Sequence, residues 1–191
     1  MDPRPAGILL TGGSSRRLGM DKATLMLDGE TLAARAARLL SAVCVRVVEV
    51  GPGVSALPAV RESPPGSGPL RALVAGAQAL ATAAPIESVV LLACDLPNVA
   101  SVLDALVAIP GDRVIVPVDE HGRRQYVCAR YGPDALARAA ALAATGERSL
   151  RALLDGPESA HVMELDGFAP GVFADIDSPA DARRAGIDLH R

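Results

Sequence analysis

Short apolar runs and longer amphipathic segments alternate along this chain. The apolar runs are typical of strands buried on both faces of a sheet, and they occupy residues 8–10, 45–50, 89–93 and 114–118. Between them, apolar residues recur every three or four positions, which predicts helices at residues 31–43, 70–84, 99–109 and 133–144. Weaker patterns predict a short strand at 59–62, a returning strand at 125–131, and helices that begin at Ser149 and at Ser178-Pro179.

The order of these elements predicts an α/β fold. Strands that alternate with helices usually form a parallel sheet with helices on both faces. We therefore expect a single domain over residues 1–191, built as three α/β/α layers around a mostly parallel, Rossmann-like sheet with one antiparallel edge. No internal repeat of 20–50 residues, low-complexity tail or linker interrupts the pattern.

The composition argues against several classes of protein. Half of the 191 residues are hydrophobic, but only 2% are aromatic, and the net charge is −3. A nucleic-acid-binding surface usually needs excess positive charge or aromatic rings for stacking, so nucleic acid is not an expected partner. No apolar run is long enough for a signal peptide or a membrane span, so no membrane partner is expected either.

The cysteines give information about the cellular compartment. Cys44, Cys94 and Cys128 lie far apart and form no C-x-x-C pair. Cys44 and Cys94 border apolar runs and are expected to be small buried residues. An odd number of cysteines without a disulfide framework is typical of a reducing compartment, and we therefore expect a cytoplasmic protein.

A stretch rich in glycine and cations, TGGSSRRLGMDK, follows the first strand. Glycines at a strand end let a ligand approach bare N–H groups. Hydroxyl groups and cations within the next few residues suit a triphosphate, whose charge must be neutralised. Since open α/β sheets bind ligands at the carboxyl ends of their strands, the stretch predicts a phosphate-binding loop. A Gly-Ser surface turn with solvated arginines is the alternative.

Two common nucleotide-binding loops are excluded. Met20 and Asp21 separate Gly19 from Lys22, which breaks the Walker pattern, and the adjacent Gly12 and Gly13 do not fit G-x-G-x-x-G. The stretch instead resembles the L-A-G-G-x-S-x-R-M-G-x-D-K motif of the nucleotidyltransferases that activate the molybdenum cofactor, most closely their guanylyltransferase branch. The resemblance covers nearly the whole chain and implies the fold of the nucleotide-diphospho-sugar transferases.

The resemblance implies a nucleotide-binding role for two segments. In the first, the implied contacts are Leu10, Thr11, Gly12, Gly13, Ser14, Arg17 and Lys22, with Arg17 and Lys22 neutralising the phosphates and stabilising the departing pyrophosphate. In the second, Gly68, Pro69 and Leu70 match a nucleotide-contacting motif at the start of a helix, where a first-turn proline is favoured. A stiff connector is the alternative interpretation of this second segment. Both segments look like the guanylyl branch, whereas the cytidylyl branch usually has Ala-Ala-Gly at the first.

Asp95 directly follows the apolar run at 89–93. A carboxylate at the end of a central strand is hard to explain by packing, and Asn98 is better placed than Asp95 to cap the next helix. Mg²⁺ binds few protein carboxylates and keeps substrate phosphates as its other ligands. The triplet Asp95-Leu96-Pro97 also matches the D-x-P motif of the family, whose Asp is implied to hold Mg²⁺.

Asp177 lies just before the last predicted helix. It could be a plain helix cap, but the resemblance implies a second metal ligand at this position, beside Asp95. The sequence departs here from many guanylyltransferases, which have Asn at the positions of Asp175 and Asp177.

The region of the acceptor substrate is less well marked. Arg123 and Arg124 lie in the turn after the strand at 114–118, where they could be solvated or could face a phosphate of the acceptor. His121 in the same turn is expected to be only a turn residue. The loop at 146–149 resembles one that relatives place near the pterin.

The reaction implied by the resemblance is a Mg²⁺-dependent transfer of GMP from GTP to molybdopterin or the molybdenum cofactor, with release of pyrophosphate. Arg17, Lys22 and Asp95 would be the catalytic residues, acting by positioning and charge stabilisation. Partners would be GTP, the pterin cofactor, and molybdoenzymes or other cofactor-biosynthesis proteins. The alternatives are a cytidylyltransferase for the same cofactor, a guanylyltransferase for another phosphorylated acceptor, or a non-catalytic adaptor, which would not need Asp95.

Overall fold

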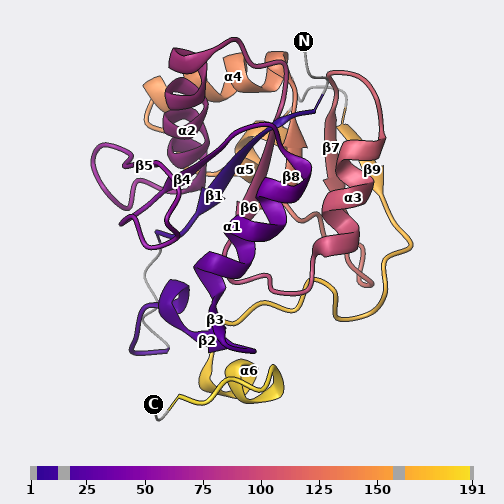
Figure 1. Ribbon diagram of the computed structural model, residues 1–191. Coiled ribbons are helices and arrows are strands. Elements are labelled where there is room, and N and C mark those ends of the chain that lie inside the picture. The colour runs from indigo at the N-terminus through magenta and orange to yellow at the C-terminus, as the bar shows by residue number, and fades with distance from the viewer. Residues whose placement is uncertain (1–3, 13–17, 157–161, 190–191) are drawn as a thin grey trace.

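The computed structural model describes residues 4–12, 18–156 and 162–189 (Figure 1). Seven of the strands form one sheet, in the order β5-β4-β1-β6-β8-β7-β9. In chain order these strands are β1 (Ala6–Leu10), β4 (Val47–Val50), β5 (Ala59–Val60), β6 (Val89–Ala93), β7 (Val114–Pro117), β8 (Cys128–Tyr131) and β9 (Val162–Leu165). All of them run parallel to one another except β8, which is antiparallel to both of its neighbours.

Five of the described helices cover the two faces of this sheet: α1 (Leu32–Val43), α2 (Pro69–Ala83), α3 (Ala100–Ala108), α4 (Pro133–Ala144) and α5 (Leu150–Asp155). The sixth, α6 (Pro179–Arg184), lies away from the sheet (Figure 1). One buried cluster joins alternate strand residues such as Ile8 and Leu91 to α2, α4 and α5. A second joins Leu9, Val90 and Leu92 to α1 and α3. Neighbouring residues of one strand thus contribute to cores on opposite faces, which defines three layers.

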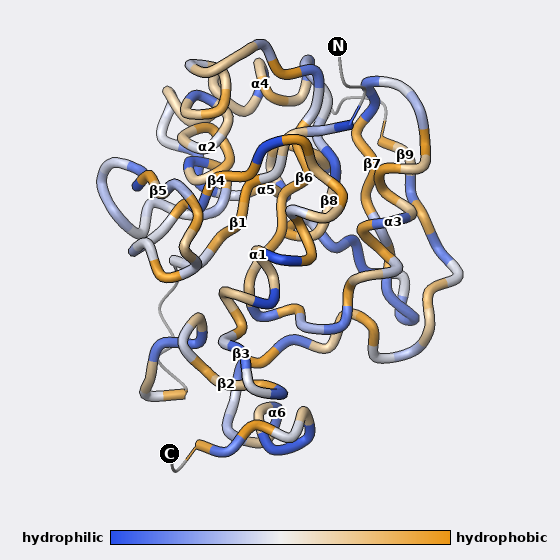
Figure 2. Tube along the Cα trace, in the orientation of Figure 1, coloured by the Kyte–Doolittle hydropathy of each residue, from blue (hydrophilic) through white to orange (hydrophobic). Residues whose placement is uncertain are grey.

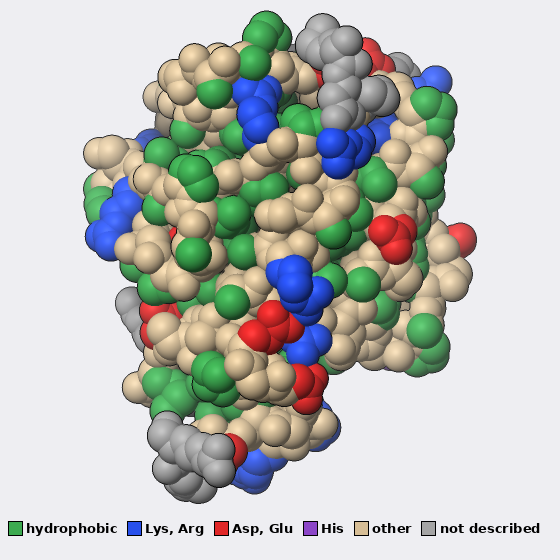
Figure 3. Space-filling view, in the orientation of Figure 1, with side chains coloured by type: hydrophobic (Ala, Val, Ile, Leu, Met, Phe, Trp, Pro, Cys, Tyr) green, Lys and Arg blue, Asp and Glu red, His purple; other side chains and the backbone are tan. Residues whose placement is uncertain are grey.

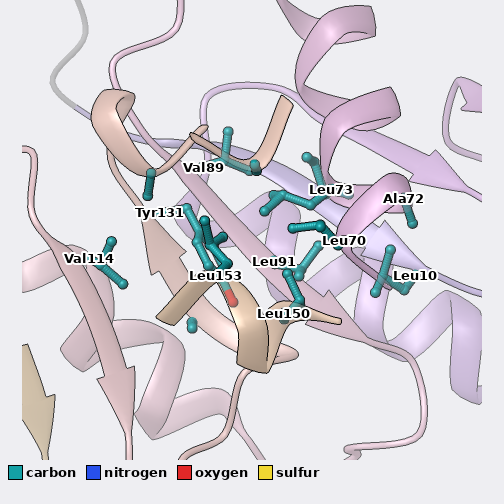
Figure 4. Close-up of a cluster of buried hydrophobic side chains, with 14 of the residues drawn as sticks. Leu10, Leu70, Ala72, Leu73, Val89, Leu91, Val114, Tyr131, Leu150 and Leu153 are labelled. Carbon is teal, nitrogen blue, oxygen red and sulfur yellow. The ribbon is translucent and has the colours of Figure 1, made fainter. Parts of the chain in front are cut away.

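Aliphatic side chains fill the first of these clusters. Leu70 and Leu73 of α2 lie against Leu10 and Leu91 of the sheet, and Tyr131 is buried beside α5 (Figure 4). The Tyr131 hydroxyl donates to the backbone oxygen of Tyr126 at 2.6 Å, so this polar group remains satisfied. Figure 2 shows hydrophobic residues concentrated along β6 and β7. Within the described ranges, no helix has both the length and the apolar composition that a membrane crossing requires.

A smaller unit lies below the sheet in Figure 1. It contains a short 3₁₀ helix, η1 (Lys22–Thr24), and a hairpin of β2 (Met26–Leu27) and β3 (Glu30–Thr31). The hairpin turns at Asp28 and Gly29, whose φ angles of 51° and 84° fit a tight two-residue turn. A third cluster packs this unit against the C-terminal segment through Leu18, Leu25, Leu27, Leu32, Ile176, Ala182 and Ile187.

The structure confirms the predicted α/β class and corrects the predicted position of the antiparallel strand. We expected an antiparallel edge, but β8 lies inside the sheet, between β6 and β7. The edge strand beyond β7 is β9, which pairs in parallel with it and was not predicted. The predicted helix starts at Ser178-Pro179 and after Thr31 are confirmed, since Ser178 and Thr31 are the N-caps of α6 and α1.

Candidate active site

The carboxyl ends of β1 and β6 lie side by side in the middle of the sheet. Leu10 is paired with Ala93, and the N–H of Cys94 donates to the Leu10 oxygen at 3.0 Å. The segment after β1 and the segment beginning at Asp95 therefore leave the sheet at adjacent points. Open α/β sheets place their ligands at this kind of edge.

Three segments that are distant in the sequence bring charged side chains together at this edge. Lys22 Nζ lies 3.1 Å from Asp95 Oδ2 and also forms an ion pair with Asp177 Oδ1. A backbone hydrogen bond fixes the C-terminal segment here, because the N–H of Ile176 donates to the backbone oxygen of Asp95 at 3.1 Å. The exposed fractions of the side chains are 18% for Lys22, 22% for Asp95 and 43% for Asp177, so the cluster is reachable from solvent.

The capping alternatives for the two carboxylates do not hold. Helix α3 has Val99 as its N-cap and no side-chain capping bond, so neither Asp95 nor Asn98 caps it. Helix α6 is capped by Ser178, whose hydroxyl accepts from the N–H of Asp181. The Asp177 side chain points instead to Lys22.

The electrostatics of the cluster favour cations. Burial alone would lower the pKa of Lys22, but the hydrogen bonds and charges of Asp177 and Asp95 outweigh it, so the pKa lies above its usual value. The pKa of Asp175 is raised as well, by burial and then by the charges of Asp177 and Asp95, so here the same carboxylates disfavour the charged form. Among the residues that the structure describes, the site thus places two carboxylates, Asp95 and Asp177, on the single ammonium group of Lys22.

Lys22 is also the single lysine of the sequence, although Lys and Arg together number 19. Asp21 fixes the backbone next to it, since its Oδ1 accepts from the N–H of Ala23 at 3.0 Å and so caps η1. The sequence therefore uses its one compact ammonium group at the point where the two carboxylates meet.

The first predicted nucleotide segment is only partly open to a ligand. Leu10 packs into the core. Thr11 is 6% exposed: its hydroxyl donates to Glu49 Oε1 at 2.5 Å and its N–H to the Val50 oxygen at 3.3 Å. Gly12 is exposed, whereas the predicted residues Gly13, Ser14 and Arg17 lie outside the described residues.

The second predicted nucleotide segment forms the start of α2. Gly68 is its N-cap, with a φ of 97° that favours glycine, and Pro69 occupies the first turn as expected. Leu70 turns its side chain into the core, and its N–H donates to the Arg148 oxygen at 3.2 Å. The side chain and the backbone N–H of Leu70 thus both have partners inside the protein.

Arg148 lies in the loop at 146–149 that resembles one near the pterin, and we predicted no separate role for it from the sequence. It fastens this loop to the loop before α2. Its guanidinium donates to the backbone oxygens of Ser67 and Gly66 at 2.9 and 2.6 Å. A pocket of about 330 Å³ lies between the two loops, lined by Pro64, Pro65, Gly66, Ser67, Arg71 and Arg148.

The arginines of the 119–124 turn have protein partners. Arg123 pairs with Asp119 at 2.8 Å. Arg124 pairs with Asp155 and Glu164, each at 2.6 Å, and so ties the start of the returning segment to α5 and β9. His121 donates its backbone N–H to Asp119 and is a turn residue, as predicted. The charges on the face shown in Figure 3 are interspersed, with basic and acidic side chains side by side over α1 and the β2–β3 hairpin.

The three-layer fold is that of the nucleotidyltransferases, and comparison with known proteins supports this class. The MobA-like NTP transferase domain matches residues 7–162. The chain therefore belongs to the MobA-like NTP transferase family.

Curated relatives match over most of their length. A "probable molybdenum cofactor guanylyltransferase" of Mycobacterium tuberculosis (strain ATCC 25618 / H37Rv) is 35% identical over 172 residues, 84% of each chain. The protein of the same name from Mycobacterium marinum is 35% identical over 187 residues, 92% of this chain and 90% of the other.

Solved structures share the fold. The molybdopterin-guanine dinucleotide biosynthesis protein A of Archaeoglobus fulgidus has a TM-score of 0.73 at 22% identity, covering 94% of this chain and 96% of that one. A nucleotidyl transferase from Methanothermobacter has a TM-score of 0.73 at 16% identity and covers 95% of both chains.

Proposed function

We propose that this protein transfers GMP from GTP to molybdopterin or the molybdenum cofactor. An oxygen of the terminal phosphate of the pterin forms a bond to the α-phosphorus of GTP. The bond from this phosphorus to the oxygen that bridges to the β-phosphate breaks, and pyrophosphate leaves. The attacking phosphate is already an anion, so no side chain has to act as a covalent nucleophile. The curated relatives that match most of the chain are named for this reaction.

The observation that supports the proposal most strongly is the meeting of Lys22, Asp95 and Asp177 where β1 and β6 end. In a nucleotidyltransferase the triphosphate needs cations, and the developing charge on the leaving pyrophosphate needs them most. We assign Lys22 to the β- and γ-phosphates. Arg17 is proposed for the same task on the strength of the sequence resemblance alone.

The donor set also fits Mg²⁺. Two carboxylates that already share one cation offer hard oxygen ligands, and Mg²⁺ in nucleotide sites is commonly held by one or two carboxylates together with phosphates. Within the described residues, no three or more His, Cys, Asp and Glu side chains lie together as a metal site. The phosphates of the nucleotide would therefore supply the other ligands of the ion. Asp95 and Asp177 would hold the ion, which when bound supplies positive charge to the phosphates.

The nucleotide would lie between the exposed Gly12 and the start of α2 at Gly68 and Pro69. Leu10, Thr11 and Leu70 support these two segments from inside, since their side chains are buried. We retain Gly13 and Ser14 as proposed nucleotide contacts from the sequence resemblance.

The test is an assay of pyrophosphate release. Purified protein is incubated with molybdenum cofactor, Mg²⁺ and, in separate reactions, GTP, CTP or ATP. We expect release with GTP. Release with CTP alone would contradict the base assignment and identify a cytidylyltransferase. Binding of nucleotide without release in any reaction would favour the non-catalytic adaptor.

A further inference from the structure

A carboxylate lies in the interior of the sheet beside the proposed nucleotide site. Glu49 is the third residue of β4, is 0% exposed, and stands between the buried Val48 and Val50. An ionised carboxylate in such a place is costly unless hydrogen bonds replace its water. The Glu49 oxygens accept five bonds of 2.5 to 3.0 Å, from Thr11 Oγ1, Gly53 N, Val54 N, Ser55 N and Ser55 Oγ.

These donors come from two different segments. Thr11 directly follows β1, whereas Gly53, Val54 and Ser55 belong to the loop between β4 and β5. Three consecutive backbone amides on one carboxylate fix the shape of a loop, because each N–H has to point toward the same group. Oε1 is shared between the segments, since it accepts from both Thr11 and Gly53.

The two segments are also in direct contact. A Cβ atom on Gly51 would collide with Thr11 Oγ1 and would lie 2.9 Å from the N atom of Gly12. Any side chain at position 51 would therefore push the loop away from the residues that follow β1. The glycine and the Glu49–Thr11 hydrogen bond together hold the 51–55 loop against Thr11 and Gly12.

We propose that Glu49 is a positioning residue for nucleotide binding. It holds Thr11 and the 51–55 loop together and thereby fixes the backbone of Gly12 against this loop. This inference rests on the proposed function, because it takes the exposed edge formed by Gly12 to be a wall of the nucleotide site. Glu49 is fully buried, so its side chain is not accessible to a ligand. It can affect nucleotide binding only through Thr11 and the 51–55 loop, whose positions depend on their hydrogen bonds to the Glu49 carboxylate.

The test uses substitutions at both ends of the Glu49–Thr11 bond, with GTP affinity measured by calorimetry in the presence of Mg²⁺. Thr11→Val keeps the side-chain shape and removes the hydroxyl donor, and we expect it to raise the Kd for GTP about tenfold. Thr11→Ser keeps the donor and should restore affinity to within about threefold of wild type. Thr82→Val is the matched control, because the Thr82 hydroxyl donates to the Ala79 oxygen near the far end of α2.

Glu49→Gln tests whether the effect passes through the carboxylate. Its amide group turns an NH₂ toward N–H or O–H donors and should weaken GTP binding more than Thr11→Val. In the Glu49→Gln background, Thr11→Val should have little further effect on the Kd for GTP. If Glu49→Gln does not fold, Glu49→Asp, which keeps the carboxylate but shortens its reach to Thr11 Oγ1, takes its place in the same comparison with Thr11→Val.

Two results would overturn the inference. One is a Thr11→Val protein with a lowered melting temperature but an unchanged Kd for GTP, which would make the pair purely structural. The other is a Thr11→Val effect of the same size with and without Glu49, which would mean that Thr11 acts on the nucleotide directly. Failure of the wild-type protein to bind GTP at all would contradict the proposed function instead.

Discussion

Lys22 and Asp95 are separated by 73 positions in the sequence, yet Lys22 Nζ lies 3.1 Å from Asp95 Oδ2. The contact is possible because β1 and β6 are neighbours in the sheet although α1, β4, β5 and α2 lie between them in the chain. It joins the cation proposed for the triphosphate to the carboxylate proposed for the metal. The predictions below begin with this pair.

Lys22→Met should weaken GTP binding by at least tenfold, which corresponds to about 1.4 kcal/mol. The reason is the loss of the ammonium group while two carboxylates remain to repel the triphosphate. Calorimetry with GTP and Mg²⁺ measures the effect. Arg38→Met is the control, because Arg38 is 59% exposed and pairs with Glu30 on the surface. Equal affinity in the Lys22→Met protein would remove Lys22 from the nucleotide site.

Because the sequence has a single lysine, chemical labelling gives an independent measurement on the same residue. An amine-reactive acylating reagent has only the Lys22 side chain and the N-terminal amine to modify. We expect GTP with Mg²⁺ to protect Lys22, with the modification read by peptide mass spectrometry, and not to protect the N-terminus. Labelling of Lys22 that GTP leaves unchanged would be the contrary outcome.

Arg130→Met should destabilise the fold by about 3 kcal/mol, since hydrogen bonds from a charged donor to buried acceptors are the stronger ones. Arg130 of β8 is 3% exposed and donates to the oxygens of Leu106, Ile109 and Gly111, where α3 ends. Urea unfolding measures the change.

The control for Arg130 is Arg46, which donates in the same way to Leu80, Ala84 and Pro85 at the end of α2 but is only half-buried. Arg46→Met should cost clearly less stability than Arg130→Met. A larger loss for Arg46→Met would show that burial does not decide the strength of these helix-end bonds.

Gly76→Ala should destabilise the protein by about 1–3 kcal/mol through overpacking, although alanine is the better helix former. A Cβ at Gly76 would meet three carbon atoms of Ile8 at 2.7 to 2.9 Å, where α2 packs on β1. Ile8 is 0% exposed and has no room to move into solvent. Thermal unfolding checks the effect, and Ile8→Val in the same chain should recover part of the loss. A Gly76→Ala protein more stable than wild type would contradict this packing.

Acid should reduce the contribution of Glu49 to stability. Burial alone would raise the pKa of its carboxyl, but hydrogen bonds from Ser55, Thr11 and the backbone hold the pKa below its ordinary value of 4.5. A folded pKa below the unfolded one gives stabilisation that is complete above pH 4.5 and is lost as the pH falls through the folded value. The difference in unfolding free energy between wild type and Glu49→Gln should therefore be constant at neutral pH and shrink below pH 4.5. A difference that grows on acidification would show that folding raises the pKa of Glu49 and would contradict this prediction.

Much of the fold follows from local patterns in the sequence. The apolar runs predicted β1, β4, β6 and β7, and the periodicity with its capping residues predicted the helices, because these signals act over neighbouring residues. The position of β8 inside the sheet depends on its pairing with β6, from Leu91 to Ala129 for example, and such non-local pairing leaves no local mark. The edge strand β9 has one neighbour and a half-exposed sequence, so it lacks the long apolar run of a central strand.

The site shows the same division between local and non-local information. Lys22, Asp95 and Asp177 could be proposed for one site from their motifs, but only the fold shows that Lys22 forms ion pairs with both carboxylates. Thr11 as a nucleotide contact stays a prediction, and the sequence did not reveal that its hydroxyl bonds Glu49 inside the protein. A signal was present, since Glu49 is a charged residue within the apolar run 45–50, but its partners in the 53–55 turn could not be inferred without the structure.

The most direct test of the central claim, that Asp95 and Lys22 act on one metal-bound triphosphate, is a paired measurement on Asp95→Ala and wild type. GTP affinity and the rate of pyrophosphate release are measured with Mg²⁺ and molybdenum cofactor present. We predict that the Asp95→Ala protein binds GTP nearly as well as wild type and releases no measurable pyrophosphate. Release at the wild-type rate would contradict the assignment of Asp95 and with it the proposed catalytic site.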